Sequence, residues 1–171
     1  MSGLRGRPSI RYAWIIAACF GVLLVGCSSA PPKPPPPPPP PKPPPVVMIE
    51  LSGSADQNPD VNGAASPVAV RIIQLVETGS FERADVFALM DHEQQTLGSE
   101  EAGSQELVLA PSEHRSIKID PKPGVTAIGV AALYRAIDDA QWRADAPVAP
   151  NGVTKLVATI GKLTVTLKPA P

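Results

Sequence analysis

The sequence has 171 residues, of which 43% are hydrophobic and 4% aromatic, and its 15 basic and 16 acidic residues nearly cancel. This balance argues against nucleic-acid binding, which requires a basic footprint. The length beyond the amino-terminal segments allows one folded core and is too short for two domains.

The amino-terminal segment has the features of a bacterial lipoprotein signal. Its first eleven residues contain three arginines and no acidic residue, and the apolar run Ala13–Leu24 follows. The run ends in Leu24-Val25-Gly26-Cys27, the pattern of a lipobox, in which the cysteine thiol is diacylated and the chain is cut before it. We therefore expect residues 1–26 to be a signal peptide and Cys27 to be lipidated.

The alternatives are a transmembrane anchor, or a signal cut elsewhere with Cys27 as an ordinary thiol. The run Ala13–Leu24 is short for a hydrocarbon core of ~30 Å at ~1.5 Å per residue. Loss of residues 1–26 would leave twelve basic and sixteen acidic residues and would also remove Cys19. Acyl chains would then provide the membrane affinity, and no free thiol would remain for a disulfide or a metal site.

A proline run follows the lipobox. Residues 31–45 are all proline except Lys33 and Lys42. Such a run has no N–H donors and a preset φ, so it favours a polyproline II rod of roughly 45 Å. The alternative is a docking site for a proline-binding partner. We expect residues 27–45 to be a tether and residues 46–168 to be the folded domain.

Period-two alternation of apolar residues predicts seven strands in the folded domain. They are Val46–Leu51, Val68–Leu75, Glu106–Leu109, Ser116–Ile119, Thr126–Tyr134, Val153–Ile160 and Lys162–Leu167. The last two should form a hairpin, with Gly161-Lys162 as a type II′ turn because glycine tolerates a positive φ.

One stretch breaks the strand pattern. Between Thr78 and Leu97 the apolar residues fall near helical spacing, with Ser80 as a candidate N-cap and Gly98 as a candidate stop. This predicts one or two short helices inserted among the strands. Many short strands with frequent turn signals predict a mainly all-β fold, a two-sheet sandwich with a short helical insertion.

The sequence offers little catalytic chemistry. His92 beside Asp91 and His114 beside Glu113 are neighbours in sequence, which favours polar loop residues over acid–base pairs. No motif of a hydrolase, metalloprotease or phosphate-binding loop is present. Trp142 is open to two interpretations, a partner hot spot or a lid over the core, and we favour the lid.

Six motifs are spread over the folded part: Asn58–Val68, Arg71–Leu75, Phe81 with Ala84–Asp91, Ile128–Val130, Tyr134–Asp138 and Gln141–Arg143. Together with the lipobox they resemble the TssJ (VasD/SciN) lipoproteins of type VI secretion systems, over about Val46 to Lys168. The resemblance implies a transthyretin-like β-sandwich, lipid-anchored in the outer membrane on its periplasmic face. Since the catalytic motifs named above are missing, we also expect no enzymatic activity and no cofactor. The resemblance further implies binding to the periplasmic C-terminal domain of the inner-membrane protein TssM, and through TssM an indirect association with TssL.

In that family the loop between the first two strands binds the partner, and here it corresponds to about Gly53–Pro67. The expected partner-binding residues are Asn58, Pro59, Asp60, Val61, Asn62, Gly63, Ala64 and Ala65. Asparagine and aspartate side chains bond their own backbone in turns, and long connections between strands are more often functional than idle. The alternative is a turn that only reverses the chain.

Two other functions remain open from the residues alone. One is a lipid-anchored periplasmic module that binds a small ligand or a cell-wall component, and the other is a periplasmic hydrolase. Capture of a large inner-membrane protein would favour the assembly lipoprotein, whereas substrate turnover would favour the hydrolase. Ser28 follows Cys27 where an aspartate would commonly retain a lipoprotein in the inner membrane, so we expect the outer membrane.

Overall fold

The computed structural model describes residues 39–171. The signal peptide expected at residues 1–26, the lipidation site at Cys27 and most of the proline run lie outside these residues. Residues 39–44, the end of that run, are exposed and belong to no helix or strand. Among the described residues no helix is long and apolar enough to cross a membrane.

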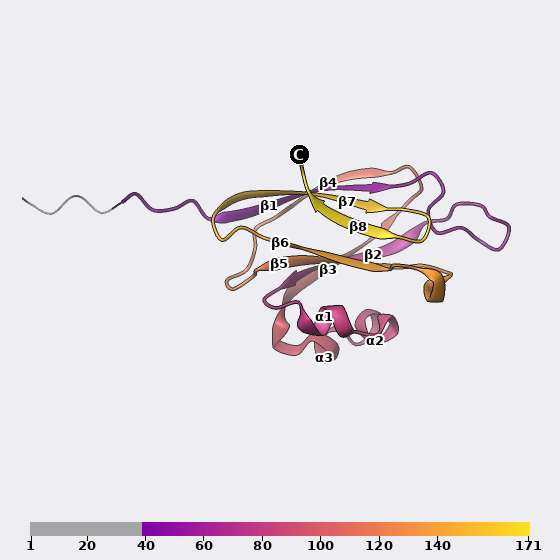
Figure 1. Ribbon diagram of the computed structural model, residues 1–171, viewed down its shortest axis with the longest axis horizontal. Coiled ribbons are helices and arrows are strands. Elements are labelled where there is room, and N and C mark those ends of the chain that lie inside the picture. Colours follow the sequence, from indigo (N-terminus) through magenta and orange to yellow (C-terminus); the bar gives the residue numbers. More distant parts are fainter. Residues whose placement is uncertain (1–38) are drawn as a thin grey trace, which may run out of the picture. The chain divides into compact units, whose positions relative to one another are not determined.

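Two four-stranded sheets pack face to face (Figure 1). The first has the order β4-β1-β7-β8, formed by β1 (Pro45–Gly53), β4 (His114–Ile119), β7 (Gly152–Ile160) and β8 (Val165–Pro169). The second has the order β3-β2-β5-β6, formed by β2 (Val68–Leu75), β3 (Glu101–Leu109), β5 (Ala127–Leu133) and β6 (Arg143–Pro147). All neighbouring strands are antiparallel except β1 and β7, which are parallel. The sandwich predicted from the sequence is confirmed.

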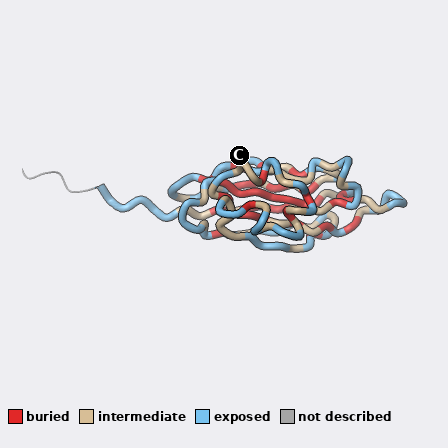
Figure 2. The backbone as a smooth tube through the Cα atoms, turned by 90° about the horizontal axis from the view of Figure 1, so that it is seen from below, coloured by how far each residue is buried: buried red, intermediate tan, exposed pale blue. Residues whose placement is uncertain are grey.

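The main core lies between the sheets and follows the period-two pattern. Alternate residues of β1 and β7 point inward and are buried: Val47, Ile49, Leu51, Leu156, Ala158 and Ile160. Figure 2 shows the buried segments concentrated in the middle of the strands. At ~25 cal/mol per Å² of apolar surface removed from water, this layer provides most of the driving force for folding.

A helical layer covers the outer face of the second sheet (Figure 1). It consists of α1 (Gly79–Arg83), α2 (Val86–Asp91), α3 (Glu93–Leu97) and the 3₁₀ turn η1 (Gly98–Glu100). The facing positions of β5 are small, and a Cβ at Gly129 would lie 2.9 Å from Phe81 Cζ. The central strand β5 is therefore buried on both faces, with the other sheet on one side and the helices on the other.

The helical insertion differs in detail from the prediction. It has three α-helical segments where one or two were expected. Ser80 is not the N-cap, because Thr78 precedes α1, and the Ser80 amide and hydroxyl donate to the Glu100 carboxylate at 2.6 and 2.8 Å. Gly98, with φ of +56°, ends α3 as predicted.

The strand predictions missed β6 and misplaced the last turn. The hairpin of β7 and β8 exists, but Ile160 pairs with Val165, so four residues connect the strands in place of a two-residue turn. Gly161 is not among the glycines with positive φ, which rules out the type II′ geometry. The cause is Gln141, whose backbone accepts from Val165 and donates to Leu163, each at 2.8 Å, and so draws this segment toward β6.

Candidate functional site

Asn58 ties the start of the β1–β2 loop, residues 54–67, to the end of the same loop and to two distant parts of the chain. Its Nδ2 donates to the Pro67 carbonyl at 2.8 Å, and its Oδ1 accepts from the Arg135 backbone N–H at 2.8 Å. Its own N–H donates to the Lys162 carbonyl at 3.0 Å. Asn58 is 3% exposed and has φ of +45°, a left-handed conformation that asparagine adopts more readily than most residues. Asn58 is therefore a buried residue whose hydrogen bonds fix the base of the loop.

Gln57 fixes the same base against β3. Its side chain is fully buried, and its Nε2 donates to the Leu109 carbonyl at 2.8 Å and to the Ser66 carbonyl at 3.4 Å. A Cβ at Gly53 would lie only 2.2 Å from the Gln57 Oε1, so the close packing here requires a glycine. The base of the loop thus continues the folded core.

The tip of the loop is an ordered turn around Asp60. The Asp60 Oδ1 accepts from the backbone N–H groups of Asn62 at 2.8 Å and Ala64 at 2.9 Å. The Ala64 and Asn62 N–H groups hold the pKa of Asp60 below its usual value. Gly63 supplies a φ of +83°, and Val61 at the apex has a relative exposure of 101%. The turn therefore presents an apolar side chain to solvent on a defined backbone.

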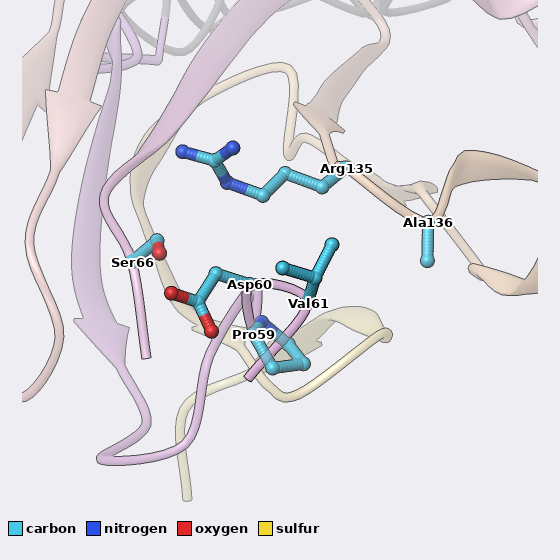
Figure 3. Close-up of a pocket in the computed structure, with 6 residues that line it drawn as sticks. All are labelled: Pro59, Asp60, Val61, Ser66, Arg135 and Ala136. Carbon is cyan, nitrogen blue, oxygen red and sulfur yellow. The ribbon is translucent and has the colours of Figure 1, made fainter. Parts of the chain in front are cut away.

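A hollow of about 490 Å³ separates the tip from the segment that follows β5 (Figure 3). The loop forms one wall and the segment forms the other: Pro59, Asp60, Val61 and Ser66 face Arg135 and Ala136. The Arg135 side chain is exposed and makes no ion pair among residues 39–171. Its attraction is a further, smaller factor that lowers the pKa of Asp60.

The eight predicted site residues fall into two groups in the structure. Val61, Asn62, Gly63 and Ala64 are exposed at the tip, and Pro59, Asp60 and Ala65 are half-buried beside it. Asn58 is buried, and both polar groups of its side chain are engaged within the fold. Arg135 and Ala136 were not among the predicted site residues, because only the tertiary fold brings them to the loop.

The histidine pairs form no recognisable reactive centre. Both His92 and His114 are exposed, and the Glu113 carboxylate is engaged by the Ala110 N–H at 2.7 Å and the Arg115 Nε at 2.6 Å. Within the described part of the chain, no group of three or more His, Cys, Asp or Glu residues is placed to hold a metal ion.

Trp142 precedes β6 and packs against both hydrophobic clusters, the one between the sheets and the one under the helices. The Arg143 guanidinium carbon lies 4.6 Å from the centre of its ring. This packing supports the interpretation of Trp142 as a lid over the core.

Comparison with known proteins assigns the fold to a family. The family model described as "Type VI secretion lipoprotein, VasD, EvfM, TssJ" matches residues 45–168. The T6SS lipoprotein TssJ1 from Pseudomonas aeruginosa is 33% identical, with a TM-score of 0.73 over 75% of this chain and 98% of that chain. A search of curated protein sequences gave no match.

Two more distant structures share the fold. Lip from Serratia marcescens, a membrane-bound component of the type VI secretion system, is 20% identical, with a TM-score of 0.67 over 75% of this chain and 97% of that chain. A chain of the structure described as the T6SS protein TssM C-terminal domain from EAEC is 20% identical, with a TM-score of 0.61 over 74% of this chain and 99% of that chain. The match to the family model and the 33% identity to TssJ1 show that the chain belongs to the type VI secretion lipoproteins of the TssJ family.

Proposed function

We propose that this lipoprotein anchors the type VI secretion membrane complex at the outer membrane by binding the periplasmic C-terminal domain of a TssM-type inner-membrane protein. The tip of the β1–β2 loop is the contact. The observation that carries the proposal is the fully exposed Val61 on a turn that Asp60 holds in place. An apolar side chain on an ordered loop loses little conformational freedom on binding, so more of its burial appears as affinity.

The placement of the loop fits a partner that comes from the opposite membrane. The tether enters the domain at Pro45, the first residue of β1, and the loop leaves after Gly53, the last residue. Nine residues of strand at ~3.3 Å each span about 30 Å, so Pro45, where the chain enters β1, and the loop lie at opposite ends of the sandwich (Figure 1). A domain held through its tether thus offers its loop away from the point of attachment.

The proposed attachment to the outer membrane depends on acylation of the Cys27 thiol. Two or more acyl chains anchor a protein stably, whereas one chain is marginal. Cys27→Ser should leave the protein unprocessed or free of the outer membrane, and Cys19→Ser should behave as the wild type because that residue precedes the cut. Membrane flotation measures both variants, and outer-membrane flotation of Cys27→Ser would contradict the anchor.

The proposed binding of the TssM-type domain is tested by replacing residues 61–64 with a Gly/Ser link and leaving Asp60 and the base of the loop intact. We expect the variant to fold, to be lipidated and to bind the TssM-type periplasmic domain at least tenfold more weakly in a calorimetric titration. The matched control replaces the exposed residues 149–151, between β6 and β7, at the tether end of the domain. Unchanged affinity of the loop variant would place the interface elsewhere.

A further inference from the structure

We infer that Arg135 is the second half of the docking site and that its guanidinium receives a carboxylate of the partner. The inference deepens the proposed function and rests on it. It adds a charged, orientation-dependent contact to the apolar contact at the tip of the loop.

The backbone fixes Arg135 relative to the loop. Its N–H donates to the Asn58 Oδ1 at 2.8 Å, so the segment after β5 and the base of the loop are joined by a partly buried hydrogen bond. From this point the side chain extends across the hollow, opposite Asp60 and Val61 (Figure 3). A partner that covers Val61 therefore also meets the Arg135 guanidinium.

The Arg135 side chain differs from those of three other arginines of the domain, which are engaged within the fold. Arg71 pairs with Glu93 at 3.0 Å, Arg115 pairs with Glu113 at 2.6 Å, and Arg143 donates to the Ala84 carbonyl at 2.5 Å. The Arg135 guanidinium has no hydrogen bond or ion pair within residues 39–171. It borders the hollow described above. Its donors are therefore available to a bound molecule.

The chemistry of the hollow selects an acidic side chain of a protein. A guanidinium presents planar N–H groups that match a carboxylate in a two-pronged hydrogen bond. The nearest acid of the loop, Asp60, already accepts from two N–H groups of its own turn and makes no ion pair with Arg135. Since Val61 is the adjacent exposed group, we expect the partner to offer an aspartate or glutamate next to an apolar residue.

The test compares the full-length, acylated protein in detergent micelles with its Arg135→Ala, Arg135→Lys and Arg83→Ala variants. The probe is the periplasmic C-terminal domain of the TssM-type protein from the same organism, and the dissociation constant is measured at low and high salt. Arg83 is the matched control, because it is an exposed arginine that lies on α1 in the helical layer. Arg135→Ala retains the backbone N–H to Asn58, so its melting temperature should be unchanged.

We expect Arg135→Ala to weaken binding at least tenfold and to reduce the salt dependence of the dissociation constant, because screening acts on the lost charge pair. Arg135→Lys should recover part of the affinity, and Arg83→Ala should bind as the wild type. If the loop replacement weakens binding but Arg135→Ala does not, the carboxylate contact is wrong and the proposed function stands. If Arg83→Ala weakens binding equally, the effect is one of net charge, and if neither the loop replacement nor Arg135→Ala matters, both proposals fail.

Discussion

The base and the tip of the β1–β2 loop belong to one connection, but they are held in place by different kinds of interaction. At the base, Gln57 and Asn58 are buried and hydrogen-bonded to segments far away in the sequence. At the tip, Val61 is fully exposed, and the bonds of Asp60 are local. The difference indicates that the base determines stability, whereas the tip remains free to determine binding. Substitutions at the base should therefore change unfolding, and substitutions at the tip should change affinity.

The largest expected effect is that of Asn58→Ala. The substitution removes the partly buried hydrogen bonds of Asn58 to the Pro67 carbonyl and the Arg135 N–H, and it places an alanine at φ of +45°. Each lost hydrogen bond costs ~0.5–1.5 kcal/mol, and the left-handed backbone costs a further ~1 kcal/mol, so we expect a loss of about 3 kcal/mol in the free energy of unfolding. Urea denaturation measures this change in the free energy of unfolding.

Two controls separate the causes in that variant. Asn58→Gly relieves the backbone strain but not the lost hydrogen bonds, so it should recover only the smaller part of the loss. Asn62→Ala, at the tip, should stay within ~0.5 kcal/mol of the wild type. An Asn58→Ala protein as stable as the wild type would end the distinction between base and tip.

Gly53→Ala should be the next most damaging change. The new methyl group would meet the Gln57 Oε1 at 2.2 Å and the Ala110 carbonyl oxygen at 2.8 Å. Overpacking of this kind costs ~1–3 kcal/mol in unfolding free energy. Gly63→Ala, at the tip, meets no atom within 4 Å and is penalised only for its φ of +83°, so thermal melting of the two variants distinguishes crowding from strain.

Val61→Ser tests the tip of the loop, where we expect a change in affinity without a change in stability. Because the side chain contributes nothing to the core, unfolding free energy should change by less than ~0.5 kcal/mol. Binding to the TssM-type domain should weaken by about fivefold, the equivalent of ~1 kcal/mol. Val153→Ser on β7 removes another exposed valine and is the matched control. Equal affinities of the two variants would mean that Val61 is not part of the contact.

The strands that the sequence predicted are those whose own residues alternate. β1, β2 and β7 were predicted within one or two residues, because one face of each is a row of aliphatic side chains. β6 was missed because Arg143–Pro147 has no such row, and its strand state comes from pairing with β5. Pairing of this kind depends on the fold and leaves no periodic signal.

The candidate site was predictable only in part for a similar reason. The turn chemistry of Asp60 and Gly63 is local, and the structure shows both residues in the expected turn. The burial of Asn58 was not predictable, since its partner Arg135 is 77 residues away and an Asn-Pro-Asp run is typical of exposed turns. Because of the same separation in sequence, Arg135 was not predicted to belong to the site.

The smallest expected effect concerns the charge of Asp60. The N–H groups of Ala64 and Asn62 stabilise the carboxylate, so its folded pKa lies below the ordinary value of 3.8. An acid with a lowered pKa contributes stability that is fully present above the ordinary pKa and is lost as the pH falls through the folded pKa. The contribution is small because the residue is only half-buried and solvent screens its charge.

Asp60→Asn retains the acceptor oxygen and removes only the charge, so it isolates this contribution. The amide proton shifts of Asn62 and Ala64 in the wild type should titrate with a midpoint below 3.8, and Asp60→Asn should abolish that titration. The free energy of unfolding of the two proteins should differ by a small constant amount at neutral pH and should converge below the midpoint. A titration at or above 3.8 would show that the turn does not hold the carboxylate, and the tip would then be a flexible loop in place of an ordered one.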